Sequence, residues 1–423
     1  MLSGMSDPVS RLNAALVLGF ALAASACGGG NGEVPNSGDG TQVAELVLEL
    51  SIGDDFEADP EYQFSRINSI LIASDGTIWV VDITEGAFGG IGRGTPLLRQ
   101  YDGEGTFVRQ VAREGDGPGE YRQPEGLVEL SDGRVAVRDL APPGKVVLFT
   151  ADGQLSETWT SYSLGAGPMM FGSGTNSALR VDVGGVLWLP IMDFGARSAS
   201  GPPPIQFLRI QPDGTVLDTV QPPSLPAVER DEVQLEHGTY SSFYEPFAMS
   251  AWSPMGTFAV ARTDQYRIEV LPPPEVSNAD VGASPPATIS PSSFIVRDVP
   301  LVPVSPADRA AERERFEQWI SAVEPGSRVA GPDIPEHKPP IRRILFADDG
   351  QLLVWVHMPS RLQDGEWTEA EACDVFDREG DLRGRVILPD SFRFYGMRED
   401  MIWGVFSDSL GVQSVRLYTV SWP

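Results

Sequence analysis

The stretch "PEGLVELSDGRVAVRD", from Pro124 to Asp139, decides the fold of this 423-residue chain. Apolar side chains alternate with other residues up to the pair Asp132-Gly133, and a second alternating run follows it. Because an Asp-Gly pair tolerates the positive φ angles of tight hairpin turns, the stretch predicts two antiparallel strands. The next stretch, "GKVVLFTADGQLSETW" from Gly144 to Trp159, repeats the pattern and completes a four-stranded unit.

This unit recurs along the chain. A clear copy precedes it at residues 67–112, and weaker copies follow at 176–220, 247–301 and 341–388. The last copy, 392–423, ends after three strands, and "AELVLELSI" from Ala44 to Ile52 is the candidate for its fourth strand. The chain is therefore predicted to be all-β, a six-bladed β-propeller closed by an N-terminal strand. Closure of the ring removes free sheet edges.

One inserted helix is predicted between blades four and five, in an insertion at about residues 303–340. Ser305 suits the N-cap, Pro306 suits the first turn, and Pro325-Gly326 ends the helix. Four apolar residues follow helical spacing and are expected to pack down: Phe316, Trp319, Ile320 and Val323. The helix is expected to cover part of one propeller face or, alternatively, to form a lid over a central site.

The N-terminus has the features of an export signal. The apolar run Leu12 to Ala24 is too short to remain as a membrane-spanning helix. The sequence "AASAC", which ends at Cys27, resembles the lipobox of bacterial lipoproteins, although Ala24 stands where leucine is commoner. This resemblance implies that Cys27 is lipidated; the alternative is an ordinary cleaved signal with an incidental cysteine.

These features set the expected domain boundaries. Residues 1–26 are predicted to be a signal peptide, 27–43 a lipidated flexible tether, and 44–423 the propeller with its insertion. The protein is expected to be exported to the bacterial cell envelope and anchored to a membrane by lipid. If Cys27 carries lipid, Cys373 is a single thiol, which we predict to be buried and inert in a strand.

The glycine-rich stretch "REGDGPGEYRQPEG", Arg113 to Gly126, has the composition of a phosphate loop or an acidic metal loop. A phosphate loop leads into a helix, however, and here a strand follows, so we predict a crossing between two blades. The loop with Tyr121, the following "PEGL" and the two Asp-Gly turns closely resemble an NHL repeat. The whole chain resembles the six-bladed propeller lipoproteins of bacteria, which implies a fold and a location but no reaction.

The net charge of −28 argues against nucleic acids and anionic lipid surfaces as partners. Because innermost strands of a propeller line its channel, residues at equivalent positions of those strands should form a ring. Alignment on the first turns places Asn68, Glu125 and Arg342 at one level, with Arg66 and Asp390 two residues upstream. These five are the candidate ligand-binding residues. The two arginines could receive a carboxylate or sugar acid, or could instead pair with Glu125 and Asp390.

Calcium is the cofactor of the alternative function. Asn68, Glu125 and Asp390 could offer oxygen ligands, as in six-bladed lactonases and paraoxonase-like hydrolases, but calcium prefers six or more. Arg342 and Phe392 at the same level oppose a divalent cation. The alternative function is accordingly a calcium-dependent hydrolase or lactonase.

No catalytic residue is assigned from the sequence. The three histidines, His237, His337 and His357, do not occupy equivalent blade positions, and no GxSxG motif is present. The favoured function is therefore a binding module without catalytic activity, whose partner is a protein, a peptide or a small molecule. A structural role in a larger envelope complex is a third alternative. We expect no cofactor, no nucleic acid, and membrane contact through the lipid anchor only.

Overall fold

The computed structural model describes residues 40–54, 59–83, 95–141, 144–160, 163–164, 179–192, 205–236, 238–272, 293–363 and 366–423. The predicted signal peptide, Cys27 and residues 28–39 of the tether lie outside these residues, as does His237. Within the described ranges, no helix is both long and apolar enough to cross a membrane. The domain boundaries and the lipidation of Cys27 remain predictions.

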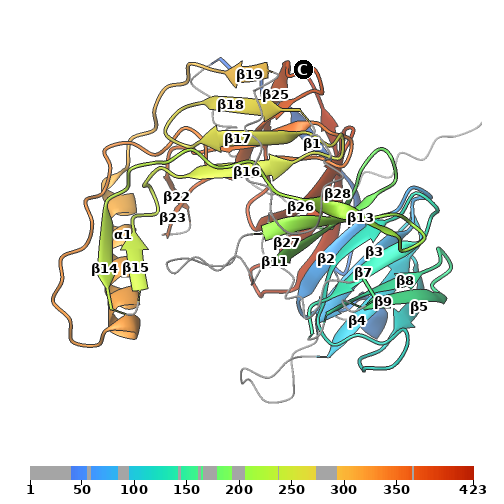
Figure 1. The fold of residues 1–423 in the computed structure, drawn as a ribbon. Helices are drawn as coiled ribbons and strands as arrows, with labels where there is room; N and C mark the ends of the chain where they lie inside the picture. The colour runs from blue at the N-terminus through green and yellow to red at the C-terminus, as the bar shows by residue number, and fades with distance from the viewer. Residues whose placement is uncertain are drawn as a thin grey trace, which may run out of the picture. The chain divides into compact units, whose positions relative to one another are not determined.

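The described strands form six four-stranded antiparallel sheets, the blades of the propeller (Figure 1). Blade one contains β2 (Ile67–Ile72), β3 (Ile78–Ile83), β4 (Pro96–Tyr101) and β5 (Phe107–Ala112). Blade two contains β6 (Pro124–Glu129), β7 (Val135–Asp139), β8 (Lys145–Phe149) and β9 (Leu155–Thr160). Blade three contains β10 (Arg180–Val181), β11 (Leu187–Met192), β12 (Ile205–Ile210) and β13 (Val216–Val220).

Blade four contains β16 (Ala248–Trp252), β17 (Phe258–Arg262), β18 (Arg267–Leu271) and β19 (Ser293–Val296). Blade five contains β20 (Arg343–Phe346), β21 (Leu352–Val356), β24 (Ala372–Phe376) and β25 (Leu382–Ile387). Blade six contains β26 (Phe392–Arg398), β27 (Met401–Ser407), β28 (Gln413–Ser421) and the N-terminal β1 (Glu45–Ile52). A short 3-10 helix, η1 (Pro60–Tyr62), precedes blade one. The predicted six-bladed fold and its closure by the N-terminal strand are confirmed.

The Asp-Gly turns have a different geometry from the one predicted. In blade one only the glycine adopts a positive φ, with Gly76 at +87°. The Gly76 N–H donates to the carbonyl of Ala73 at 3.0 Å, and the Thr77 N–H donates to the Asp75 carboxylate at 2.9 Å. Asp132 and Asp213 accept the same local bond in later blades. The aspartate therefore closes the turn with its side chain, and the glycine supplies the left-handed conformation.

The core consists of six apolar clusters, each shared by two neighbouring blades. The cluster that closes the ring combines Ile67 and Val80 of blade one with Trp403 and Val415 of blade six. Closure thus rests on side-chain packing as well as on the pairing of β1 with β28.

The chain before β1 also contacts blade five. The Ala44 N–H donates to the Arg385 carbonyl, the Arg385 N–H donates to the Gln42 carbonyl, both at 2.8 Å, and Arg297 bonds the Thr41 hydroxyl at 2.6 Å. Residues 41–44 therefore pair with the outer edge of blade five before β1 joins blade six. Cys373 in β24 is fully buried, as predicted, and burial raises the pKa of its thiol.

The insertion contains the predicted helix, α1 (Pro306–Val323), with a capping box between Ser305 and Asp308. Its apolar side packs against a hairpin that was not predicted from the sequence, β14 (Glu232–Leu235) and β15 (Gly238–Ser241) (Figure 1). The ring of Tyr240 lies 5.1 Å from that of Phe316 and 5.2 Å from that of Trp319. A second hairpin, β22 (Arg361–Gln363) and β23 (Glu366–Thr368), is inserted between β21 and β24.

Candidate functional site

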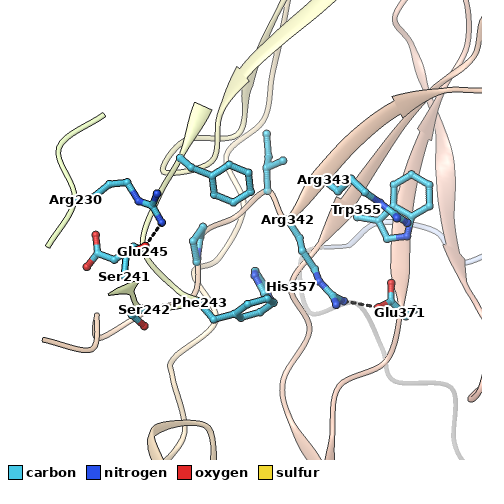
Figure 2. Close-up of a pocket in the computed structure, with 13 residues that line it drawn as sticks. Arg230, Ser241, Ser242, Phe243, Glu245, Arg342, Arg343, Trp355, His357 and Glu371 are labelled. Atoms are coloured by element: carbon cyan, nitrogen blue, oxygen red, sulfur yellow. Dashed lines mark hydrogen bonds and ion pairs between the residues drawn. The ribbon is translucent and has the colours of Figure 1, made fainter. Parts of the chain in front are cut away.

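A pocket of about 550 Å³ lies at the junction of blades four and five. Its walls come from the segments that lead into β16, β20 and β24, from the end of β21, and from the insertion (Figure 2). This is the face at which the innermost strands begin. The charged and aromatic side chains of its lining include Arg230, Phe243, Arg342, Arg343, His357 and Glu371.

The charged groups of this pocket are three arginines, Arg230, Arg342 and Arg343, and two glutamates, Glu245 and Glu371. Arg342 Nη1 donates to Glu371 Oε1 at 2.6 Å, and both side chains are about one-third exposed, at 31% and 37%. Arg230 lies 3.7 Å from Glu232 and donates to the Ser241 hydroxyl. An ion pair this exposed is weak and can exchange partners. Arg342 is therefore accessible to an anion that enters the pocket.

Aromatic rings form the rest of the wall. The Arg343 guanidinium carbon lies 4.0 Å from the centroid of the Trp355 ring, a cation–π contact. Phe243 and Phe247 are 48% and 38% exposed, which is high for phenylalanine in a folded chain. The pocket thus offers guanidinium groups next to apolar rings.

A buried ion network lies directly behind this wall. The ammonium group of Lys338, whose side chain is 0% exposed, lies 3.3 Å from Asp308 and 2.8 Å from Glu369. It also bonds the Ser360 hydroxyl at 2.8 Å, and this hydroxyl donates to Asp308 at 2.7 Å. Burial raises the pKa of Asp308, but bonds from Ser360 and Ser305 and the charge of Lys338 outweigh it and lower that pKa to about 2. The network joins α1 to blade five.

His357 connects the network to the pocket. Its Nδ1 lies 2.9 Å from Glu369 Oε1, which also accepts the Met358 N–H at 2.7 Å. The side chain of His357 is 4% exposed and its ring is flanked by Phe243 and Tyr244, with centroids 6.1 and 6.0 Å away. The close-up shows His357 beside Phe243 and Arg342 pointing to Glu371 (Figure 2).

Of the five residues predicted as ligand-binding, Arg342 lines this pocket. Its carboxylate partner is Glu371, whereas the sequence suggested Glu125 or Asp390. Arg66 is exposed, and its backbone N–H donates to Asp82 at 2.8 Å.

The other three predicted residues are engaged elsewhere. Asn68 donates to the Pro124 carbonyl at 3.1 Å, and Glu125 lies 3.9 Å from Arg138. Asp390 bonds Arg361 at 2.7 Å and Gln363 at 2.9 Å, both on the β22–β23 hairpin. The proposed roles of these residues stay predictions.

The described residues do not fit the alternative calcium site. In the part of the chain that the structure describes, no group of three or more His, Cys, Asp or Glu side chains is arranged to hold a metal ion. Asn68, Glu125 and Asp390 have the separate partners given above. Phe392 is 5% exposed and packs edge-on against Tyr418 in the core. We derive no calcium chemistry for this channel.

The opposite end of the innermost strands carries an ion cluster of a different kind. Asp348 lies 3.7 Å from Arg180 and 3.6 Å from Arg398, so it joins blades three, five and six. Arg398 also donates to the Ile72 carbonyl of blade one at 3.1 Å. These contacts tie the blades together at the end of the channel away from the pocket.

Sequence reasoning missed Phe243, Lys338, His357 and Glu369, because none of them occupies an equivalent position in the blades. One signal was available. Lys338 is one of only two lysines among 31 basic residues, beside Lys145, and it is the fully buried one.

No protein-family model matches the chain, and no curated protein matches its sequence significantly. Among solved structures it is similar to a Bacteroides fragilis protein described as exported, with 13% identity, 91% of this chain and 97% of the other covered, and a TM-score of 0.43. It is also similar to the PQQ-bound aldose sugar dehydrogenase of Streptomyces coelicolor, with 13% identity, 89% and 98% covered, and a TM-score of 0.38. For a luciferin-regenerating enzyme the values are 14% identity, 85% and 92% covered, and a TM-score of 0.35. At these TM-scores and identities, the similarities do not indicate a function for this protein.

Proposed function

We propose that this protein is an exported, lipid-anchored propeller that binds a small anionic ligand in the pocket between blades four and five. The ligand carries a carboxylate next to an aromatic or other apolar group. The observation that carries the proposal is that two arginines lie over aromatic rings in one pocket of a chain with net charge −28: Arg343 over Trp355 at 4.0 Å and Arg342 over Phe243 at 6.0 Å.

Carboxylates suit this pocket for geometric reasons. A guanidinium group presents a planar fork of donors that matches a carboxylate, and such charge-assisted bonds are stronger than neutral ones. Arg342 already holds one carboxylate, that of the partly exposed Glu371. A ligand carboxylate would take the place of Glu371 or share Arg342 with it, while Phe243 and Phe247 contact the apolar part.

The location follows from the N-terminal sequence. The apolar run before Cys27 supports export, and the lipobox resemblance supports anchoring of the mature chain through Cys27. Membrane contact would then occur through lipid alone, and the negative charge of the chain disfavours nucleic acids as ligands.

The test is calorimetric titration of the purified full-length protein with benzoate and with benzamide, which has the same shape without the charge. Benzoate should bind and benzamide should not. Arg342→Gln should weaken benzoate binding about tenfold or more, since a hydrogen bond to a charged group contributes about 1.5–3 kcal/mol. The matched control is Arg361→Gln, which removes an arginine paired with Asp390 outside the pocket wall. Equal affinities of wild type and Arg342→Gln for benzoate, or no binding of benzoate, would refute the proposal.

A further inference from the structure

The pair His357 and Glu369 has an arrangement that ligand binding alone does not require. The contact between His357 Nδ1 and Glu369 Oε1 is 2.9 Å long, and the histidine lines the pocket while the glutamate lies behind it. Burial raises the pKa of Glu369, but its bonds and charge interactions with His357 and Lys338 outweigh this and lower the pKa. Glu369 is therefore an ionised carboxylate held in place by a buried ammonium group and a backbone N–H.

This contact decides which nitrogen of His357 carries the proton. An ionised carboxylate only accepts hydrogen bonds, so Nδ1 of His357 is the donor. In a neutral imidazole the other nitrogen, Nε2, is then an acceptor. A histidine whose tautomer is fixed by a carboxylate, next to a pocket with a guanidinium group, has the geometry of a general base.

We infer that His357 acts as the general base in the hydrolysis of a carboxylate-bearing ester bound in this pocket. This activity goes beyond the proposed binding role and rests on it. Arg342 would hold the carboxylate of the substrate. His357 Nε2 takes a proton from water as the water oxygen bonds to the ester carbonyl carbon. The tetrahedral intermediate then breaks its bond to the alcohol oxygen, which receives that proton from the imidazolium. The products are a carboxylic acid and an alcohol, and no electrons are exchanged with a cofactor.

Water is assigned as the nucleophile because neither of the neighbouring serines, Ser241 and Ser242, is hydrogen-bonded to His357. Ser242 is 1% exposed and its hydroxyl accepts the Tyr244 N–H at 3.3 Å, whereas the Ser241 hydroxyl is bonded to Arg230. Among the hydrogen bonds of the described residues, none joins His357 to a serine. Glu369 acts through His357 and is a positioning residue.

The test uses two chromogenic esters, mono(4-nitrophenyl) succinate and the uncharged 4-nitrophenyl butyrate, with the full-length protein. Wild type should hydrolyse the charged ester with the higher kcat/KM. His357→Ala should lower kcat about 100-fold or more, the usual contribution of a general base. Free imidazole should restore part of the activity of His357→Ala, which a structural histidine would not allow.

Three further variants sharpen this test. His337→Ala removes an exposed histidine of the insertion between blades four and five and should keep full activity. Glu369→Gln should lower kcat with little change in KM, since it disturbs the tautomer and not the binding groups. His357→Gln replaces the ring by an amide that still donates to Glu369, and it provides a folded inactive variant if His357→Ala unfolds.

The outcomes separate the two proposals. Benzoate binding without ester hydrolysis, or equal hydrolysis by wild type and His357→Gln, would overturn the catalytic inference and leave the binding proposal intact. If neither benzoate nor the charged ester is bound, both are refuted.

Discussion

Two crossings between neighbouring blades perform the same topological task with very different lengths of chain. The chain passes from β5 to β6 through residues 113–123, and from β19 to β20 through residues 297–342. In the short crossing the carboxylates are used locally: Glu120 accepts from the Gly117 N–H at 2.8 Å and from Arg113 at 2.7 Å. A Cβ at Gly115 would collide with the Glu120 carboxylate, so a larger residue there would displace this carboxylate from its two bonds.

The long crossing places two of its carboxylates, those of Asp308 and Glu312, in the interior instead. Glu312 of α1 is 1% exposed and accepts from the Tyr240 hydroxyl at 2.9 Å and the Phe243 N–H at 3.0 Å. Asp308 reaches the network around Lys338. Through these contacts the insertion holds the segment that carries Phe243 into the pocket wall. The comparison teaches that the short crossing only connects blades, whereas the long one also builds a site.

The largest expected effect comes from the short crossing. Tyr121 is 0% exposed and its hydroxyl donates to the Ala112 carbonyl at 3.1 Å. Tyr121→Ala should lower the free energy of unfolding by about 3–5 kcal/mol, because it leaves a large cavity between blades one and two. Denaturant unfolding measures this loss. Benzoate affinity should not change under native conditions; a weakened affinity would show that the two crossings are coupled.

Lys338→Met should lower the free energy of unfolding by about 3 kcal/mol, since it leaves Asp308 and Glu369 without their cation in a buried site. It should also increase hydrogen exchange in α1 and weaken benzoate binding. Lys145→Met is the control, because this lysine lies 3.7 Å from Asp139, which backbone N–H groups already satisfy. Lys145→Met should lower the free energy of unfolding by less than about 1 kcal/mol. Equal costs for the two lysines would contradict the account of the long crossing.

Acid should weaken the long crossing as the carboxylate of Asp308 becomes protonated. The pKa of Asp308 is about 2 in the folded protein, against 3.8 for an aspartate side chain in an unfolded chain. The folded-state pKa is the lower one, so its contribution is present above about pH 4 and is lost as the pH falls towards 2. Asp308→Asn should therefore destabilise the protein by about 2 kcal/mol at pH 6 and much less at pH 2.5. A pH-independent difference between the two proteins in denaturant unfolding would argue against this pKa.

The smallest effect is expected at Asp116, whose ion pair with Arg122 lies at the surface of the short crossing. Asp116→Asn should change the free energy of unfolding by less than about 0.5 kcal/mol, because exposed pairs contribute little. A larger loss in denaturant unfolding would mean that the short crossing depends on its charges as the long one does.

The fold could be predicted because its signals are local and repeated. The alternation of apolar and other residues around Asp75-Gly76, and around the equivalent turns of the other blades, predicts the first hairpin of each blade. Ser305 with Asp308 marks the start of α1. The hairpin β14–β15 escaped prediction because it is short and polar, and its ring contacts are with α1, a segment about 75 residues away in sequence. Tertiary packing, and not local propensity, determines it.

The pocket could not be predicted for a related reason. Equivalent blade positions were the only geometric guide that the sequence offered, and of the five residues they indicated, Arg342 is the one that lines the pocket. Phe243, Lys338, His357 and Glu369 come together because three insertions depart from the repeat: the β14–β15 segment, the segment with α1, and the β22–β23 hairpin. A search for exceptions to the repeat, such as a lone buried lysine, would have been the better guide.

The central claim is that the junction of blades four and five binds an anionic ligand. The most direct measurement is anomalous diffraction from crystals soaked in 4-iodobenzoate, with the iodine as an unambiguous marker. The account predicts an iodine peak beside Phe243 and Phe247, with the carboxylate in hydrogen-bond contact with Arg342. A saturated crystal with no iodine in this pocket, or with iodine bound only elsewhere on the propeller, would contradict it.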